Sequence, residues 1–281
     1  MNRSLPMAAL AAALTGSAGA QAWLDDFNDG SAVDGTPVLW TASPAFASAF
    51  DVSDGDLVIE MPPGASPAIS SARVPINFAS GASVRARLIA FDGPGRFAVA
   101  LADQLTGIKG YVASFSTCGG GRLELFRGDV PGAIVFLRGG QVAMPYGPLE
   151  EHYLQLDVFD GVVSARVWRP GEPFPEAQLS APDTTYAGGV ASIAIQDFGS
   201  GNCVPSGDFA DVNAVVRFAQ ASSSPLTHSG IGDLDADGRV GHHDLAMLLA
   251  AWGDGARDPA DLNDDGAVDE QDLATLLSEW G

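Results

Sequence analysis

Between residues 23 and 219, short runs of alternating apolar and polar side chains are separated by glycine, proline and aspartate. A period of two is typical of β-strands that bury one face, and no helical stripe interrupts the pattern. The alternation predicts strands over residues 57–61, 83–88, 97–101, 111–115, 123–126, 134–137, 191–195 and 212–218.

The clearest unit of this pattern is residues 153–168. Every second residue is apolar from Leu154 to Val158 and again from Val163 to Val167, and Asp160-Gly161 between them is a tight-turn signal. These residues predict a β-hairpin with one face in a core. About ten strands in this region favour a mainly β fold, an antiparallel two-sheet β-sandwich.

Two segments near the C-terminus have a helical period instead. Apolar residues stand at i, i+3, i+4 and i+7 in Leu245, Leu248, Leu249 and Trp252, and again 28 positions later in Leu273, Leu276, Leu277 and Trp280. Since neither apolar stripe can be buried alone, we expect the two helices to pack on each other.

Each helix follows an acidic loop, and the two loops repeat one pattern. Oxygen-bearing side chains at loop positions 1, 3, 5 and 12, with glycine at position 6, are what a calcium loop requires. The first loop offers Asp233, Asp235, Asp237, the carbonyl group of Arg239, and Asp244. The second offers Asp261, Asn263, Asp265, the carbonyl group of Ala267, Asp269 and Asp272. The sequence therefore predicts two calcium ions as cofactors.

Three other interpretations of this segment are open. A solvated acidic linker would also be rich in Asp-Gly turns, but turns do not repeat a twelve-residue ligand pattern. Magnesium prefers a small octahedral shell that keeps its waters. His242 and His243 could bind a transition metal, although adjacent side chains point in different directions and no third ligand is nearby in the sequence.

The net charge and the first residues of the chain indicate which partners the protein can bind and whether it is exported. Its formal charge of −21 argues against a nucleic-acid partner. Residues 230–281 hold thirteen acidic and two basic side chains, a net charge of −11. Residues 1–22 have Arg3, an apolar stretch and small residues typical of a signal peptide, so we expect a secreted protein. No other stretch is apolar enough to predict a membrane span, and we expect no anchor at the C-terminus.

The sequence has two cysteines, Cys118 and Cys203, both in glycine-rich segments. Export permits a disulfide, and the even count favours one between them. Two free thiols are the alternative.

The C-terminal repeat resembles the dockerin type I module. The resemblance covers about residues 230–281 and rests on the duplicated loop, the aspartate at position 12 and the absence of a helix before each loop. It implies calcium-dependent docking to a cohesin-like or other extracellular protein. Where cellulosomal dockerins usually have a Ser-Thr pair before position 12, this chain has His242-His243 and Glu270-Gln271, which leaves the partner's identity open.

The preceding region resembles the concanavalin A-like and laminin G-like jelly rolls. The resemblance rests on the acidic opening at residues 25–29, on residues 51–59 and on a last strand at residues 211–215 that could return beside the first. It implies a glycan ligand. The chain thus divides into residues 1–22 (signal peptide), 23–219 (sandwich), 220–230 (Ser/Pro linker) and 231–281 (tandem calcium-loop module).

The sandwich region lacks the carboxylate pattern of a glycoside hydrolase on this fold. Glycoside hydrolases need two carboxylates, on this fold typically in a Glu-x-Asp-x-x-Glu string, and no such string occurs. Glu60 and Glu124 are isolated and are interpreted as solvated surface residues. Trp168 alternates onto the outer face of its hairpin, where it could stack on a sugar or pack beneath residues 170–175.

We therefore expect a secreted protein with a non-catalytic, carbohydrate-binding or structural β-sandwich and a calcium-dependent docking module. The alternatives are a glycoside hydrolase or lyase and a structural surface protein without a glycan ligand.

Overall fold

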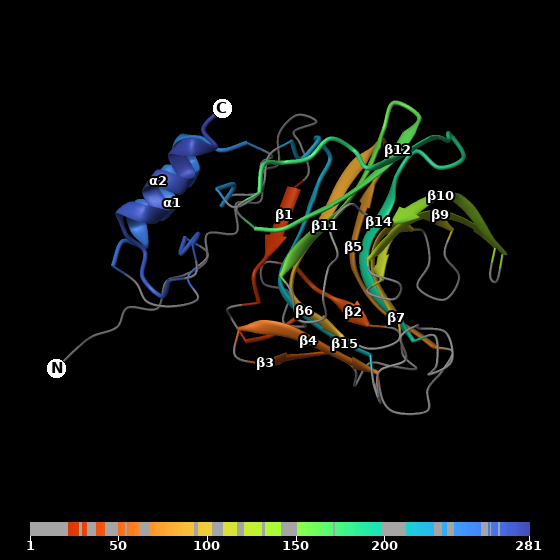
Figure 1. Cartoon of the computed structure of the whole chain (residues 1–281), viewed down its shortest axis with the longest axis horizontal. Coiled ribbons are helices and arrows are strands. Elements are labelled where there is room, and N and C mark those ends of the chain that lie inside the picture. Colours follow the sequence, from red (N-terminus) through yellow and green to blue (C-terminus); the bar gives the residue numbers. More distant parts are fainter. Residues whose placement is uncertain are drawn as a thin grey trace.

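The computed structural model consists of two antiparallel β-sheets packed face to face, with two short helices beside them (Figure 1). It describes residues 22–27, 30–32, 38–42, 50–53, 55–61, 68–92, 95–102, 109–116, 121–130, 133–141, 151–170, 172–197, 212–227, 232–234, 239–253, 258, 260–263 and 265–281. The predicted mainly β sandwich is confirmed.

The first sheet, sheet A, has eight strands, with β1 paired to β15 beside the main path. Its main path, in spatial order, is β13 (Leu179–Pro182), β12 (Val162–Trp168), β11 (His152–Phe159), β6 (Ala82–Asp92), β15 (Val212–Ser222), β4 (Asp56–Met61) and β3 (Phe50–Ser53), and β1 is Ala22–Asp25. Strand β15 pairs with β4 from Val212 to Val216 and with β1 from Ala219 to Ser222, which confirms that the last strand returns beside the first.

The second sheet, sheet B, has seven strands and curves strongly at the edge formed by β9 and β10 (Figure 1). Its spatial order is β10 (Ala133–Gln141), β9 (Arg122–Val130), β8 (Gly110–Ser116), β7 (Gly95–Ala102), β14 (Gly189–Asp197), β5 (Ala68–Phe78) and β2 (Thr41–Ala42).

The predicted hairpin is present as β11 and β12. Leu156 pairs with Ala165, and both are fully buried in the core between the sheets. Asp160 and Gly161 have φ values of 51° and 74°, the left-handed conformations that a type I′ turn requires. The turn residues thus set the register that the alternation needs.

Strand β5 has no counterpart among the predicted strands. Its pairing with β14 shifts register between Val190, opposite Asn77, and Ser192, opposite Arg73. Pro75 lies inside that irregularity, where a residue without an N–H group costs no ladder hydrogen bond. The proline therefore breaks the sequence pattern without ending the strand.

The C-terminal segment contains two nine-residue helices, α1 (His242–Ala250) and α2 (Glu270–Ser278), which pack on each other as predicted. Their ends are tied reciprocally: Gly253 N donates to the Val268 carbonyl at 2.9 Å, and Gly281 N to the Val240 carbonyl at 3.1 Å. Both donors and acceptors are 28 residues apart, so the sequence repeat is a structural repeat.

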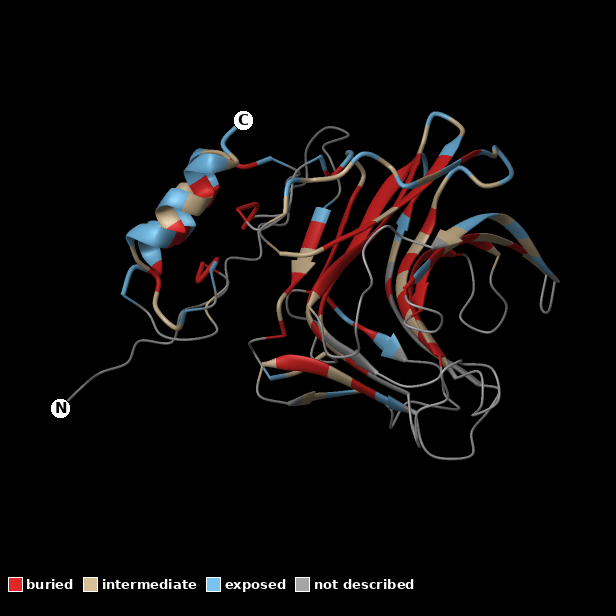
Figure 2. Ribbon diagram, in the orientation of Figure 1, coloured by how far each residue is buried: buried red, intermediate tan, exposed pale blue. Residues whose placement is uncertain are grey.

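Each helix buries only part of its apolar stripe. Leu248 and Leu276 are fully buried. Two other members of each stripe are about half exposed, namely Leu249 and Trp252 in the first and Leu277 and Trp280 in the second. The buried side of each helix is therefore narrower than its apolar stripe, and most of the ribbon of the helices is coloured as exposed in Figure 2.

Residues 220–227 are part of the sandwich rather than a free linker. Strand β15 continues to Ser222, and Leu226 is buried against sheet A. Its N–H group donates to Ser83 Oγ at 3.1 Å, and its carbonyl accepts from Gln155 Nε2 at 3.0 Å. Among the described residues, neither helix has the length and apolar composition to cross a bilayer.

Candidate functional site

One candidate site lies on the outer face of sheet B, away from the core. In β9, Leu123 and Leu125 point into the core, so the residues between and beside them point outward. The strand register then brings Ser114 opposite Glu124 and Phe126 opposite Phe136. We call this outward group the sheet B face, and it comprises Arg96, Ser114, Arg122, Glu124, Phe126 and Phe136.

Glu124 lies between two guanidinium groups on this face. Its carboxylate is 3.0 Å from Arg96 Nη1 and 2.9 Å from Arg122 Nε. The Glu124 side chain is only 14% exposed, whereas that of Arg122 is 55% exposed. Glu124 is therefore not the solvated surface residue that the sequence indicated, because two cations hold it against the sheet.

Two aromatic rings extend the sheet B face onto the edge strand. The Phe126 and Phe136 ring centroids are 5.5 Å apart at an interplanar angle of 64°. The Arg96 guanidinium carbon lies 4.9 Å from the Phe126 centroid. Phe136 is 51% exposed, so its ring is available to a ligand while Phe126 supports it from the side.

Small side chains continue the same face along β7 and β14. Ala98, Ala100 and Ala102 are buried with Val112, and Ala194 packs partly against them, although they point away from the main core. Small residues leave the backbone surface low beside the larger aromatic and charged groups. The face can therefore accommodate an extended, flat ligand.

The charges on the sheet B face influence one another. Burial lowers the pKa of Arg96, Glu124 opposes that shift, and the nearby Arg122 cation lowers the pKa further. The two guanidinium groups are thus close enough to repel each other while sharing one carboxylate.

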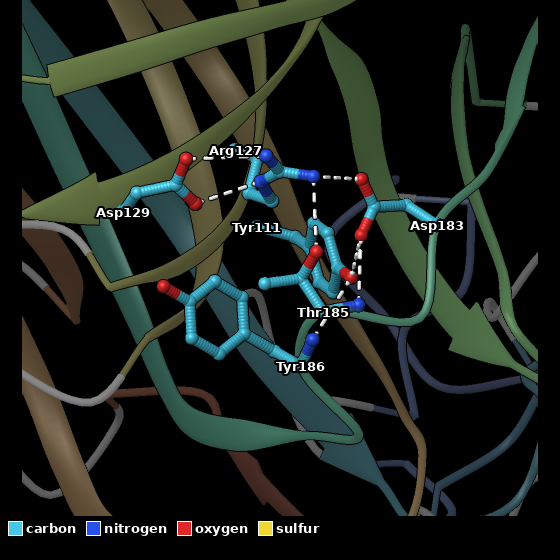
Figure 3. Close-up of polar contacts among 6 residues, drawn as sticks. All are labelled: Tyr111, Arg127, Asp129, Asp183, Thr185 and Tyr186. Atoms are coloured by element: carbon cyan, nitrogen blue, oxygen red, sulfur yellow. Dashed lines mark hydrogen bonds and ion pairs between the residues drawn. The ribbon is translucent and has the colours of Figure 1, made fainter.

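A second polar cluster joins the two sheets at the β13 edge (Figure 3). Tyr111 Oη donates to Asp183 Oδ1 at 2.7 Å, and Arg127 Nη1 donates to the other carboxylate oxygen and to Thr185 Oγ1. Asp129 accepts from Arg127 Nε at 2.7 Å. These groups hydrogen-bond to one another across the sandwich, which indicates a structural network.

The network changes the acidity of its members. Burial raises the pKa of Tyr111 to about 12. Burial alone would also raise the pKa of Asp183, but hydrogen bonds from Tyr111, Thr185 and Arg127 outweigh it and lower that pKa to about 2. The ionised Asp183 carboxylate therefore stabilises the fold at pH values above the ordinary pKa of an aspartate. This contribution is lost as pH falls from about 4 through 2.

We predict that Asp183→Asn will lower the melting temperature most at neutral pH. The difference from the unchanged protein should shrink as pH falls from 5 to 2, because the Asp183 carboxylate is then protonated anyway. Melting followed by circular dichroism across this range measures the effect. Asp160→Asn, in the exposed β11–β12 turn, is the control, and a pH-independent difference for Asp183→Asn would contradict the prediction.

The outer face of sheet A is covered rather than open. Trp168 is 1% exposed, stacks on Tyr153 at 4.9 Å and 12°, and meets the Phe174 ring edge-on at 5.3 Å. Of the two interpretations of Trp168, packing beneath residues 170–175 fits the structure, and the ring is not accessible to a sugar. The sequence placed Trp168 outward correctly but could not indicate what covers it.

The C-terminal module also covers this face. Tyr153, Trp168 and Phe218 of sheet A share one apolar cluster with Leu234 and Val240 of the module. Gln220 Nε2 in β15 donates to Asp233 Oδ2 at 2.9 Å, and both residues are buried. The first acidic loop is therefore in direct contact with the sandwich.

Beside this interface is a pocket of about 230 Å³, lined by Asp157, Phe159, Val162, Ser164, Arg166, Phe174, Pro225, Leu226 and Thr227. Its buried carboxylate, Asp157, accepts from Ser83 Oγ at 2.5 Å and from Gln155 Nε2 at 2.7 Å, and it is paired with Arg166. Burial raises the pKa of Asp157, and Arg166 opposes the shift. The polar groups beside this pocket hydrogen-bond to one another, and Ser83 and Gln155 hold Leu226 in place.

The second acidic loop has its oxygen-bearing side chains turned toward its own backbone. Asp261 accepts from Asp265 N at 3.1 Å and from Gly266 N at 2.9 Å, and Asn263 Oδ1 accepts from Asp265 N at 2.9 Å. Asp272, at position 12, accepts from Leu262 N at 2.7 Å and from Asp269 N at 2.8 Å. Positions 1, 3, 5 and 12 are thus brought around one loop.

The described part of the first loop repeats this arrangement. Asp244 accepts from Leu234 N at 2.7 Å and from Gly241 N at 2.6 Å, as Asp272 does from the equivalent residues. Asp233 and Asp244 are both buried. Asp235 and Asp237 lie outside the described residues, and so do both cysteines of the predicted disulfide and residues 1–21 of the predicted signal peptide.

The donor set of the loops fits calcium better than a softer metal. Every ligand predicted from the sequence is a carboxylate, amide or carbonyl oxygen, the type that calcium binds. Among the described side chains, no three His, Cys, Asp or Glu groups are already gathered as a metal cluster. The carboxylates instead accept backbone hydrogen bonds, which hold them in the loop.

The sequence did not indicate that Phe126, Phe136 and Glu124 lie together in one site. One pattern did point to an aromatic residue on the outer face of β9. In Leu123-Glu124-Leu125-Phe126 a large aromatic occupies the polar phase of the alternation. The partner ring, Phe136, becomes visible only through the β9–β10 register.

Comparisons with known proteins indicate the fold. No protein-family model and no curated protein matches the sequence. A β-glucanase from Bacillus licheniformis matches with a TM-score of 0.51 and 10% identity, over 73% of this chain and 99% of the other. A β-1,3-1,4-glucanase (lichenase) derived from a mouse hindgut metagenome matches with a TM-score of 0.50 and 12% identity, over 71% and 98%. The sandwich has the concanavalin A-like jelly-roll fold.

Proposed function

We propose that the sandwich is an extracellular carbohydrate-binding domain that uses the sheet B face. The observation that carries the proposal is a half-exposed ring, Phe136, beside the Arg96–Glu124–Arg122 group on the outer face of a curved sheet. Sugar rings stack on exposed aromatic faces, and charged side chains hydrogen-bond their hydroxyl groups. Two of the structurally similar proteins are glucanases, which supports a polysaccharide ligand.

Binding without hydrolysis fits the carboxylates of this face. Glycoside hydrolysis needs an acid and a nucleophile or base, about 5–9 Å apart. Among the strand residues of sheet B whose side chains are described, only Glu124 is a carboxylate in the outward phase, since Asp129 is bound to Arg127 in the polar network at the β13 edge. Glu124 is also held by two cations. A hydrolase or lyase remains the alternative that release of reducing sugar would reveal.

For the C-terminal module we propose calcium-dependent docking to an extracellular protein such as a cohesin-like domain. The repeated loops support calcium, which when bound would neutralise part of the module's −11 charge and bring the loop oxygens together. The half-exposed Leu249, Trp252, Leu277 and Trp280 offer apolar contacts to a partner. Secretion through residues 1–22 belongs to the same proposal.

The first experiment incubates the protein with a panel of insoluble and soluble polysaccharides in calcium. Depletion of the protein and release of reducing sugar are both measured. Depletion without release is the expected result, and sugar release would favour the hydrolase. Failure to bind any polysaccharide would overturn carbohydrate binding.

We predict that Phe136→Ala will weaken polysaccharide binding about tenfold, or about 1.4 kcal/mol. The change removes the exposed stacking surface but little of the core, so the melting temperature should change little. Val162→Ala removes a similarly exposed apolar side chain on sheet A and is the control. Equal binding by both variants would place the sugar elsewhere.

A further inference from the structure

The sheet B face carries a charge opposite to that of the protein. The chain has a formal charge of −21, with 35 acidic and 14 basic side chains. On the sheet B face, however, two arginines share one carboxylate. Positive charge concentrated on one face of an acidic protein points to an anionic ligand for that face, because the acidic remainder of the surface would repel an anion.

The arginines are placed so that a second anion can approach. Arg122 contacts Glu124 through Nε, which is one of the five N–H donors of a guanidinium. Its side chain is 55% exposed, so the group extends toward solvent. Arg96 is held more firmly, by Glu124 and by Ser114 Oγ at 3.5 Å from Nη1, with its guanidinium over Phe126. Arg122 is therefore the cation available to a ligand, and Arg96 supports it.

The electrostatic balance also favours an added carboxylate. Arg122 lowers the pKa of Arg96, so the two cations repel each other despite Glu124 between them. A second carboxylate would reduce that repulsion. Guanidinium groups bind carboxylates through paired, charge-assisted hydrogen bonds, which gives this contact geometry as well as strength.

We propose that the sheet B face selects anionic polysaccharides whose sugars carry carboxylates, with Arg122 paired to a uronate group and Phe136 stacked on a sugar ring. The inference rests on the proposed carbohydrate binding and adds the class of ligand. A neutral glycan would leave the excess positive charge of the face uncompensated. A uronic acid supplies both an apolar ring face and an anion on one unit.

The test compares glucuronoxylan with the same polymer after its carboxyl groups have been reduced to alcohols. The full chain, in calcium, is titrated with each polymer by calorimetry at low and high salt. We expect at least tenfold tighter binding to the native polymer, falling with added salt. Equal binding of the two polymers overturns the anionic selectivity and leaves carbohydrate binding intact. Binding of no polysaccharide in the wider panel overturns both.

Variants separate the roles of the two charges. Arg122→Gln should weaken binding of the native polymer about tenfold and leave binding of the reduced polymer unchanged. Glu124→Gln should strengthen binding of the native polymer, because it removes the carboxylate that competes for Arg122. Weaker binding by Glu124→Gln, at an unchanged melting temperature, would instead make Glu124 a hydrogen-bonding partner of the sugar and overturn the proposal.

Arg138→Gln is the matched control. Arg138 is an exposed arginine on the neighbouring strand β10, opposite the inward-facing Leu125 and outside the sheet B face. An equal loss of affinity for Arg138→Gln and Arg122→Gln would indicate general attraction to polyanions and overturn the proposal. Preference for dextran sulfate over glucuronoxylan would do the same for carboxylate recognition.

Discussion

Trp168→Ala is expected to lower the free energy of unfolding by about 3–5 kcal/mol, the usual cost of removing a large buried aromatic side chain. The ring is buried between Tyr153 and Phe174, and the guanidinium carbon of the fully buried Arg85 lies 5.3 Å from its centroid. Burial lowers the pKa of Arg85 to about 10, so this cation depends on the groups that surround it. When Trp168 is removed, Arg85 loses its aromatic partner, and this loss adds to the decrease in unfolding free energy that the cavity causes.

The same substitution should loosen the C-terminal module. Trp168 belongs to the apolar cluster that Leu234, Val240 and Leu248 share with sheet A. Urea unfolding followed by circular dichroism gives the stability, and amide hydrogen exchange in α1 and α2 reports on the module. We expect faster exchange there under conditions in which the sandwich stays folded.

Trp252→Ala provides the matched comparison, because Trp252 is 44% exposed on the module. Its replacement should cost about 0.5 kcal/mol, as for most surface substitutions. Similar losses of unfolding free energy for the two variants would show that Trp168 does not support the interface between sheet A and the C-terminal module. A large loss for Trp168→Ala without faster exchange in the helices would confine its role to sheet A.

The strands were the part of the fold most accessible from the sequence. Alternation over residues 153–168 indicated both strands of a hairpin, and Asp160-Gly161 supplied the backbone conformations that its turn needs. Strand β5 was not accessible in this way. Its pattern is broken by Pro75, and only the register shift against β14 shows how a proline can lie within a strand.

Side-chain environment was harder to predict than secondary structure. Alternation placed Trp168 on the outer face of its hairpin, but residues from the module, far away in the sequence, cover that face. Periodicity likewise placed Leu248 and Leu249 on one helical stripe, yet only Leu248 is buried. A local pattern gives direction, whereas burial depends on long-range packing.

The sheet B face illustrates the same limit. Glu124 and Phe126 could be read as outward residues of one strand, but Arg96 and Phe136 reach them from other strands. Their contacts follow from cross-strand register, which a single sequence does not specify. In the C-terminal loops, by contrast, spacing along the chain defines the ligand pattern, so the calcium prediction needs no long-range information.

Replacing Asp261 and Asp265 together with alanine should remove calcium binding at the second loop. Both carboxylates belong to the predicted ligand set, and both accept backbone hydrogen bonds that fold the loop, from Gly266 N and Ala267 N. Loss of two anionic oxygen ligands from one site should weaken it by at least a hundredfold, or about 2.7 kcal/mol. Calorimetric titration should then register one calcium ion per chain in place of two.

Glu270→Ala is the control for the loss of negative charge alone. Glu270 is an exposed residue at the start of α2 and is not in the predicted ligand set, so this variant should still bind two ions. Two ions bound by the Asp261 and Asp265 double variant would refute the ligand assignment.

Calcium at the first loop should also stabilise the sandwich, because Gln220 of β15 hydrogen-bonds Asp233 of that loop. The expected gain in the free energy of unfolding is about 2.7 kcal/mol at a calcium concentration one hundred times Kd. Unfolding of the sandwich at the same urea concentration with calcium and with chelator would mean that the first loop and β15 are not energetically coupled.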